Sequence, residues 1–149
     1  TTGFDFSSNK QQLDVIAEFL AFLVQAADRR VYEIMDGEER QRFITALALH
    51  VAGTLEDNLR EEVGAGDYRS GFINLLNERM EAYSEFKFVD GLPSYPSMRY
   101  FATRVDAVMG GEENKWVLEQ IIEVEAPEAT KSFDRAINDL LEGRKPQID

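Results

Sequence analysis

The sequence predicts an all-α protein, a single-domain helical bundle of five or six helices built on an N-terminal antiparallel helical hairpin. Apolar residues recur at three- and four-residue steps through most of the chain, which is the periodicity of amphipathic helices. No segment alternates apolar and polar residues convincingly over the length of a strand. The 149 residues suffice for one domain with a hydrophobic core. We expect an arm at 1–7, the bundle at 8–143 and a tail at 144–149.

The first predicted helix, 8–35, begins with the pattern of a capping box, Ser8 followed three residues later by Gln11. Two apolar stripes run side by side along it. The first stripe contains Leu13, Ile16, Leu20, Leu23, Val24, Ala27, Val31 and Ile34. The second stripe contains Val15, Phe19, Phe22 and Ala26. A surface helix buries only one such face, so this helix is either the centre of the bundle or it offers the second stripe to a homodimer seam.

The second predicted helix follows after a very short connection, which makes the two helices an antiparallel hairpin. Asp36 is placed to act as its N-cap, with Glu39 at the capping-box position. We expect its buried face to contain Phe43, Ile44, Leu47, Ala48, Val51, Ala52, Leu55 and Leu59. We expect its exposed face to contain Arg40, Gln41, Glu56, Asp57 and Arg60. The glycines at 64 and 66 end the helix.

The remaining helices are predicted over 68–86, with Asp67 as cap, over 97–109, and from 112 onward. The segment 88–96 between the first two is predicted to be irregular, with a turn at residues 90 and 91. Pro127 either kinks the last helix or begins a sixth helix at a position where proline is tolerated. The two outcomes for this proline give the count of five or six.

Composition excludes several classes of protein. A net charge of −12 disfavours nucleic acid and anionic membranes as partners, because their phosphates require clustered Lys and Arg. The same charge suits a basic protein partner. The absence of cysteine excludes disulfides and thiolate chemistry and is compatible with a reducing cytosol, so we expect a cytoplasmic protein. No apolar run approaches the roughly 20 residues of a membrane span.

His50, the only histidine, is the natural candidate for acid–base chemistry. A di-iron site of the ferritin type would need Glu-x-x-His on two helices, but residue 47 is leucine and no second histidine exists. No phosphate-binding loop and no serine-nucleophile elbow is present. We therefore expect His50 to be partly buried and hydrogen-bonded within the bundle, and we predict no catalytic residue and no cofactor.

Carboxylates on the later helices are the second group of candidate site residues. We expect them to form a solvated face and predict no metal site, because buried charges need partners. If the protein does bind a metal ion, the ligands would come from Glu78, Glu81, Glu119 and Glu123.

Aromatic side chains gather around the irregular segment, and we predict them as contact residues for a partner: Phe86, Phe88, Tyr95 and Tyr100. The same segment holds Pro93 and Pro96 in the spacing of a polyproline ligand. The simpler interpretation of this spacing is a stiff connector between two helices.

These observations favour a non-enzymatic protein-interaction or regulatory protein, homodimeric, that acts on another protein through a helical groove or through the aromatic segment. One alternative is a bundle that binds a metal or a small ligand with core-facing carboxylates. A second alternative is an antitoxin or immunity-type inhibitor of a basic partner.

Overall fold

The helices of this chain are arranged around the first one. The computed structural model describes residues 9–89, 92–110 and 135. In this part of the chain the elements are α1 (Asn9–Val31), α2 (Gly37–Glu62), α3 (Tyr68–Tyr83), β1 (Phe88–Val89), β2 (Leu92–Pro93) and α4 (Tyr95–Val108). The all-α class is confirmed, and the described residues hold four helices rather than five or six. The helices predicted after residue 111, the arm at 1–7 and the tail at 144–149 lie outside the described residues.

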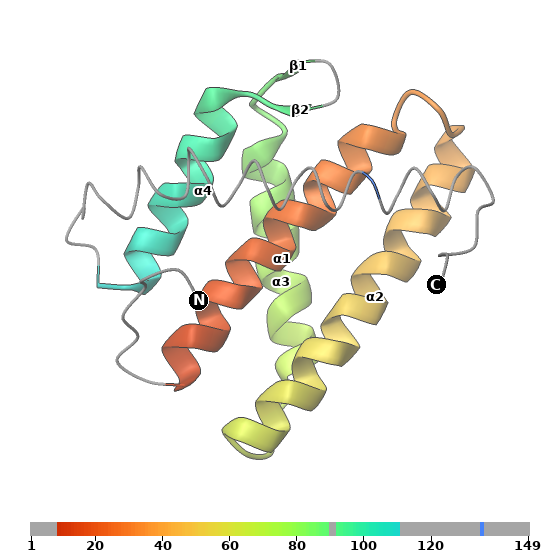
Figure 1. The fold of residues 1–149 in the computed structure, drawn as a ribbon. Coiled ribbons are helices and arrows are strands. Elements are labelled where there is room, and N and C mark those ends of the chain that lie inside the picture. The colour runs from red at the N-terminus through yellow and green to blue at the C-terminus, as the bar shows by residue number, and fades with distance from the viewer. Residues whose placement is uncertain (1–8, 90–91, 111–134, 136–149) are drawn as a thin grey trace, which may run out of the picture.

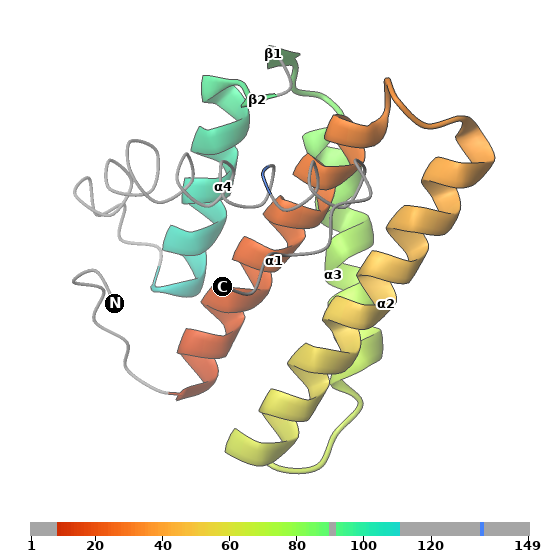
Figure 2. The ribbon, with the colours of Figure 1, turned by 45° about the vertical axis from the view of Figure 1, so that its right-hand side comes forward.

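The helix α1 lies between α2 on one side and α4 on the other, with α3 behind it (Figures 1 and 2). It packs against all three of these helices, and α2 also packs against α3. A helix in this position must be apolar over most of its circumference, which accounts for both apolar stripes. The central-helix alternative therefore explains the sequence pattern of α1 within one chain.

The hairpin of α1 and α2 forms as the local sequence predicts. Asp36 caps α2, and its Oδ1 accepts a hydrogen bond of 2.8 Å from the backbone N–H of Glu39. The helix α1 ends at Val31, earlier than predicted, and the carbonyl of Val31 accepts from the N–H groups of Ile34 and Met35 instead. An ion pair of 2.7 Å between Arg40 Nε and Asp28 Oδ1 joins the two helices next to this turn.

One prediction from the sequence is wrong at the junction of α2 and α3. Glu56 was expected on the exposed face of α2, but it is only 7% exposed. Its carboxylate accepts a hydrogen bond of 2.9 Å from the backbone N–H of Arg69, in the first turn of α3, and lies 3.4 Å from the guanidinium of Arg60. A buried carboxylate is stable here because the helix N-terminus and a cation both compensate its charge. The predicted cap Asp67 is confirmed.

The segment before α4 is more ordered than predicted. The two short strands pair antiparallel, with Phe88 opposite Pro93; the predicted turn at 90 and 91 lies outside the described residues. Ser94 then caps α4, which begins at Tyr95 with Pro96 in its first turn. Pro93 therefore lies in a strand within the connection between α3 and α4, and Pro96 lies in the first turn of α4, so the segment is less irregular than predicted.

The core divides into two main clusters on either side of α1. Between α1 and α4, with the end of α3, the buried residues are mainly aromatic: Phe22, Tyr83 and Phe101, with Val15, Ala102 and Val105. Between α1, α2 and α3 they are mainly aliphatic: Ala17, Ala21, Val24, Ala48, Ala52, Leu55, Leu59, Phe72 and Leu76. We name these the aromatic flank and the aliphatic flank of α1.

Candidate functional site

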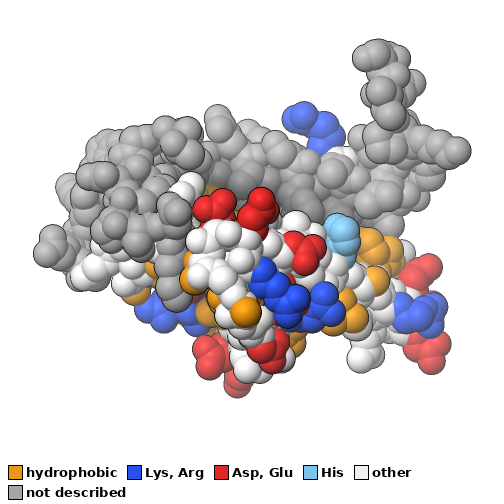
Figure 3. All heavy atoms as spheres, turned by 90° about the horizontal axis from the view of Figure 1, so that it is seen from below, with side chains coloured by type: hydrophobic (Ala, Val, Ile, Leu, Met, Phe, Trp, Pro, Cys, Tyr) orange, Lys and Arg blue, Asp and Glu red, His pale blue; other side chains and the backbone are white. Residues whose placement is uncertain are grey.

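A groove of about 520 Å³ lies between the first half of α1 and the second half of α2, and we name it the α1–α2 groove. Because the two helices run antiparallel, these halves lie side by side. From α1 the groove is lined by Gln12, Leu13, Ile16 and Leu20. From α2 it is lined by His50, Val51, Thr54, Leu55, Asn58 and Glu62. Figure 3 views the molecule from below and shows hydrophobic, acidic and basic side chains next to one another on the described surface.

The helical spacing of the lining residues separates an apolar floor from a polar rim. On α2 the rim residues follow one another at every fourth position, His50, Thr54, Asn58 and Glu62, so they form one row along the helix. All four are exposed. The neighbouring row on α2 and the facing side of α1 supply the apolar floor: Val51, Leu55, Leu13, Ile16 and Leu20. The row from residue 50 to residue 62 is about 18 Å long.

The surface of α2 beside the α1–α2 groove is acidic. None of the ten described side chains that line the groove is Lys or Arg, and Glu62 is among them. Asp57 and Glu61 stand three residues after Thr54 and Asn58, at neighbouring positions on the exposed surface of α2. Glu61 and Glu62 also occupy the last turn of α2, where the helix dipole disfavours negative charge. A positive group at this end of the groove would therefore interact favourably with the carboxylates and with the helix end.

His50 lies on the rim and is exposed, so the expectation of a partly buried histidine was wrong. The inner positions of α2 are taken by the aliphatic flank, which leaves residue 50 on the solvent side. Among the described residues that line the groove, Glu62 is the one carboxylate, and it lies about 18 Å from His50 along the helix axis. This distance is far too long for these two side chains to act as an acid–base pair.

The four aromatic residues predicted as contact residues do not form one surface. Tyr100 contacts Phe86 with ring centroids 5.6 Å apart, and both are half-buried. The guanidinium of Arg29 lies 4.9 Å above the ring of Phe88. Tyr95 is the exposed member of the group, at 58%. Three of the four side chains are therefore engaged within the chain.

The residues predicted for a dimer seam lie on the aromatic flank. Phe22 stacks on Phe101 at 4.4 Å, and Phe19 meets the same ring edge-on at 4.6 Å. Val15, Phe22 and Ala26 are buried and Phe19 is half-buried. This stripe has its contacts within one chain, and the homodimer stays a prediction.

The carboxylates named as possible metal ligands are not brought together. Glu78 and Glu81 are both exposed on α3, and Glu119 and Glu123 lie outside the described residues. Within the part that the structure describes, no three His, Cys, Asp or Glu side chains are grouped so that they could hold a metal ion.

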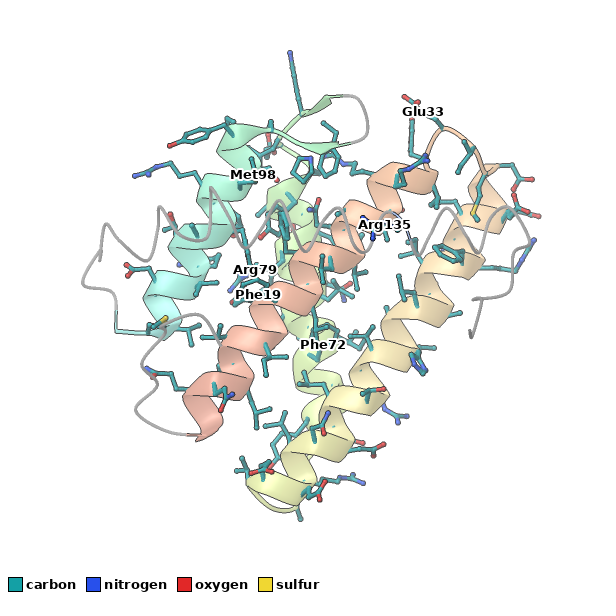
Figure 4. All side chains as sticks on the ribbon, viewed as in Figure 1. Phe19, Glu33, Phe72, Arg79, Met98 and Arg135 are labelled. Carbon is teal, nitrogen blue, oxygen red and sulfur yellow. The ribbon has the colours of Figure 1, made fainter. Side chains whose placement is uncertain are left out.

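A buried ion pair, which the sequence did not predict, joins α1 and α3. Both oxygens of Glu18, which is 3% exposed, accept hydrogen bonds of 2.9 Å from Arg79 (Figure 4). The hydrogen bond to Glu18 raises the pKa of Arg79, and burial raises the pKa of Tyr83 nearby. The available signal was Glu18 with Gln25, two polar residues seven positions apart on one face of an apolar helix.

In the described part of the chain, several other buried polar atoms have no hydrogen-bond partner: Gln25 Nε2 and Oε1, Tyr83 Oη, Ser97 Oγ and Arg104 Nε. They belong to the packing of α1, α3 and α4. We therefore assign the ion pair and its surroundings to the structure of the core, and the α1–α2 groove is the candidate site.

Comparison of the chain with protein-family models, with curated proteins and with solved structures found no match. None of the helices in 9–89 and 92–110 combines the length and the apolar character that crossing a membrane requires.

Proposed function

We propose that this protein is a non-enzymatic protein-interaction protein, which binds a segment of another protein in the α1–α2 groove. The observation that carries this proposal is the groove itself, with its floor of five aliphatic side chains and its exposed polar rim. Exposed apolar surface rimmed by polar residues is typical of sites for protein partners. A regulatory protein and an inhibitor of the immunity or antitoxin type would both use such a site.

The shape of the groove favours a protein segment over a small molecule. Small-molecule sites enclose most of the surface of their ligand. Here His50, Thr54, Asn58 and Glu62 are exposed along one edge, and Ile16 on the facing helix is 38% exposed. The groove is therefore open along its length, as a surface for an elongated ligand would be.

The proposal can be tested with a neutral amphipathic peptide, Leu at every third or fourth position and Gln elsewhere. We expect a nuclear magnetic resonance titration to shift the methyl signals of Leu20 and Leu55, which line the floor. The substitution Ile16→Asp should abolish these shifts, because it places a charge on the apolar floor.

Leu49→Asp is the matched control, since Leu49 is an exposed aliphatic residue of α2 (52%) outside the groove lining. It should leave the titration unchanged. Shifts scattered over other surfaces, or equal effects of the two substitutions, would contradict the proposal.

A further inference from the structure

We infer that the segment bound in the α1–α2 groove is a basic amphipathic helix, with Lys or Arg residues flanking its apolar stripe. This inference rests on the proposed function and names the chemistry of the partner. Its first basis is the acidic surface of α2 beside the groove, and its second basis is the length and pattern of the floor.

The floor matches one face of a short helix. Its polar edge of about 18 Å equals a little more than three helical turns. Leu13, Ile16 and Leu20 on α1 face Val51 and Leu55 on α2, so the floor is aliphatic from both sides. A helix laid between them would contact this floor with residues at positions i, i+3 or i+4, and i+7, which is the usual pattern of helix-in-groove recognition.

The charges beside the groove favour a basic helix as its ligand. The exposed carboxylates of Asp57 and Glu61 lie on the last turns of α2, and none of the ten described side chains that line the groove is Lys or Arg. The nearest cation in sequence, Arg60, lies 3.4 Å from the buried carboxylate of Glu56. The positive charge of Arg60 therefore lies at the α2–α3 junction, next to Glu56. The net charge of −12 adds a long-range attraction for a basic ligand.

The same charges argue against a second copy of this chain in the groove. In a symmetric dimer built on this surface, the acidic end of each α2 would meet the acidic surface of its twin. Like charges across an interface weaken it. A basic helix from a different protein removes this repulsion, and it also places positive charge at the C-terminal end of α2.

The experiment compares three versions of one helical peptide of about fifteen residues, with the same leucine stripe and with Lys, Gln or Glu at the flanking positions. Affinity for the full chain is measured by fluorescence anisotropy at low and at high salt. We expect the Lys peptide to bind at least tenfold more tightly than the Gln peptide at low salt, and the Glu peptide to bind more weakly than both. High salt should remove most of the advantage of the Lys peptide.

A matched pair of double substitutions locates the effect. Asp57→Lys with Glu61→Lys reverses two exposed charges, four residues apart, beside the groove. Glu81→Lys with Glu85→Lys reverses two exposed charges with the same sequence spacing, in the last turn of α3 and just after its end. Both variants change the net charge equally, and circular dichroism checks that both remain folded. We expect only the first to weaken binding of the Lys peptide by about tenfold or more.

The results of these binding experiments distinguish a failure of the basic partner from a failure of the proposed function. If Gln and Lys peptides bind equally well, or if both double variants act alike, the basic partner is wrong while the groove remains a binding site. If no peptide binds, because the chain's own residues or a second copy occupy the groove, the proposed function also fails. Tighter binding of the Lys peptide, lost only in the Asp57 and Glu61 variant, supports both.

Discussion

The aliphatic and the aromatic flanks of α1 bury the same helix in two different ways. On the aliphatic flank small residues such as Ala21 and Ala52 are fully buried, and small contact residues allow helices to approach closely. On the aromatic flank Phe22 stacks on Phe101. The Glu18–Arg79 ion pair lies at the junction of α1 and α3, beside the aromatic cluster.

We expect this difference to separate the residues that determine stability from those that would bind the proposed partner. On the aromatic flank the Glu18–Arg79 ion pair is buried, and large rings fill the space between α1 and α4. On the aliphatic flank Glu56 is buried as well, but Asp57 and Glu61 are exposed beside the α1–α2 groove. We therefore expect substitutions on the aromatic flank to change mainly the free energy of unfolding, and substitutions at the groove rim to change mainly binding.

The largest effect is expected from Phe22→Ala. Phe22 is fully buried and contacts both Tyr83 and Phe101, so its loss should leave a cavity and lower the free energy of unfolding by about 4 kcal/mol. Leu76→Ala on the aliphatic flank should cost less, about 3 kcal/mol. Urea denaturation measures both values. A clearly larger loss for Leu76→Ala would contradict the ranking of the two flanks.

Glu18→Ala is expected to destabilise the protein by about 3 kcal/mol, because it leaves the guanidinium of Arg79 buried without its carboxylate. The double substitution Glu18→Leu with Arg79→Met removes both charges and replaces them with apolar side chains. We expect the double variant to be within about 1 kcal/mol of the natural protein. Equal losses in the single and double variants would show that the side-chain packing, and not the buried charge, matters.

Two tyrosines, one on each flank, should respond to the loss of their hydroxyl group with opposite changes in the free energy of unfolding. The hydroxyl of Tyr83 on the aromatic flank is buried without a partner, so Tyr83→Phe should be neutral or raise the free energy of unfolding by up to about 1 kcal/mol. The hydroxyl of Tyr68 on the aliphatic flank donates a hydrogen bond of 2.7 Å to the carbonyl of Gly64. Tyr68→Phe should therefore cost about 1 kcal/mol. Thermal denaturation of the two variants checks the sign, and a loss in both would indicate an unseen partner of Tyr83.

The features that the sequence predicted correctly depend on neighbouring residues. Asp36 lies three residues before the N–H group that it caps, and Asp67 has the same relation to Ser70. Gly64 adopts a φ of 123°, which favours glycine at the end of a helix. Such signals lie within one turn of the chain, so a pattern of a few residues contains all of the information.

The features that the sequence missed depend on distant residues. Glu18 is buried because Arg79 stands 61 positions further on, and no local pattern relates the two. Glu56 was assigned to the surface because its partner belongs to the next helix. The α1–α2 groove depends on how two helices rotate against each other, so neither helix alone indicates it. For the same reason the exposed position of His50 was not predicted.

The smallest effect concerns the helix caps, which also differ between the flanks. The helices α2 and α3 on the aliphatic flank are capped by carboxylates, whereas α4 is capped by the hydroxyl of Ser94. The hydrogen bonds to the side chain and the backbone of Ser70 lower the pKa of Asp67. A lowered pKa in the folded state means that the capping carboxylate stabilises the fold above its unfolded pKa near 3.9. This stabilisation is lost as the pH falls through the folded pKa.

Asp67→Ala should therefore lower the unfolding temperature at pH 7, and its deficit relative to the natural protein should shrink as the pH falls below about 4. Ser94→Ala, which removes a cap without a titratable group, should show a deficit that stays constant over the same range. Unfolding temperatures measured from pH 7 to pH 3 compare the two variants directly. A constant deficit for Asp67→Ala would mean that the carboxylate caps α3 equally well when protonated, and that the two flanks do not differ in the pH dependence of their caps.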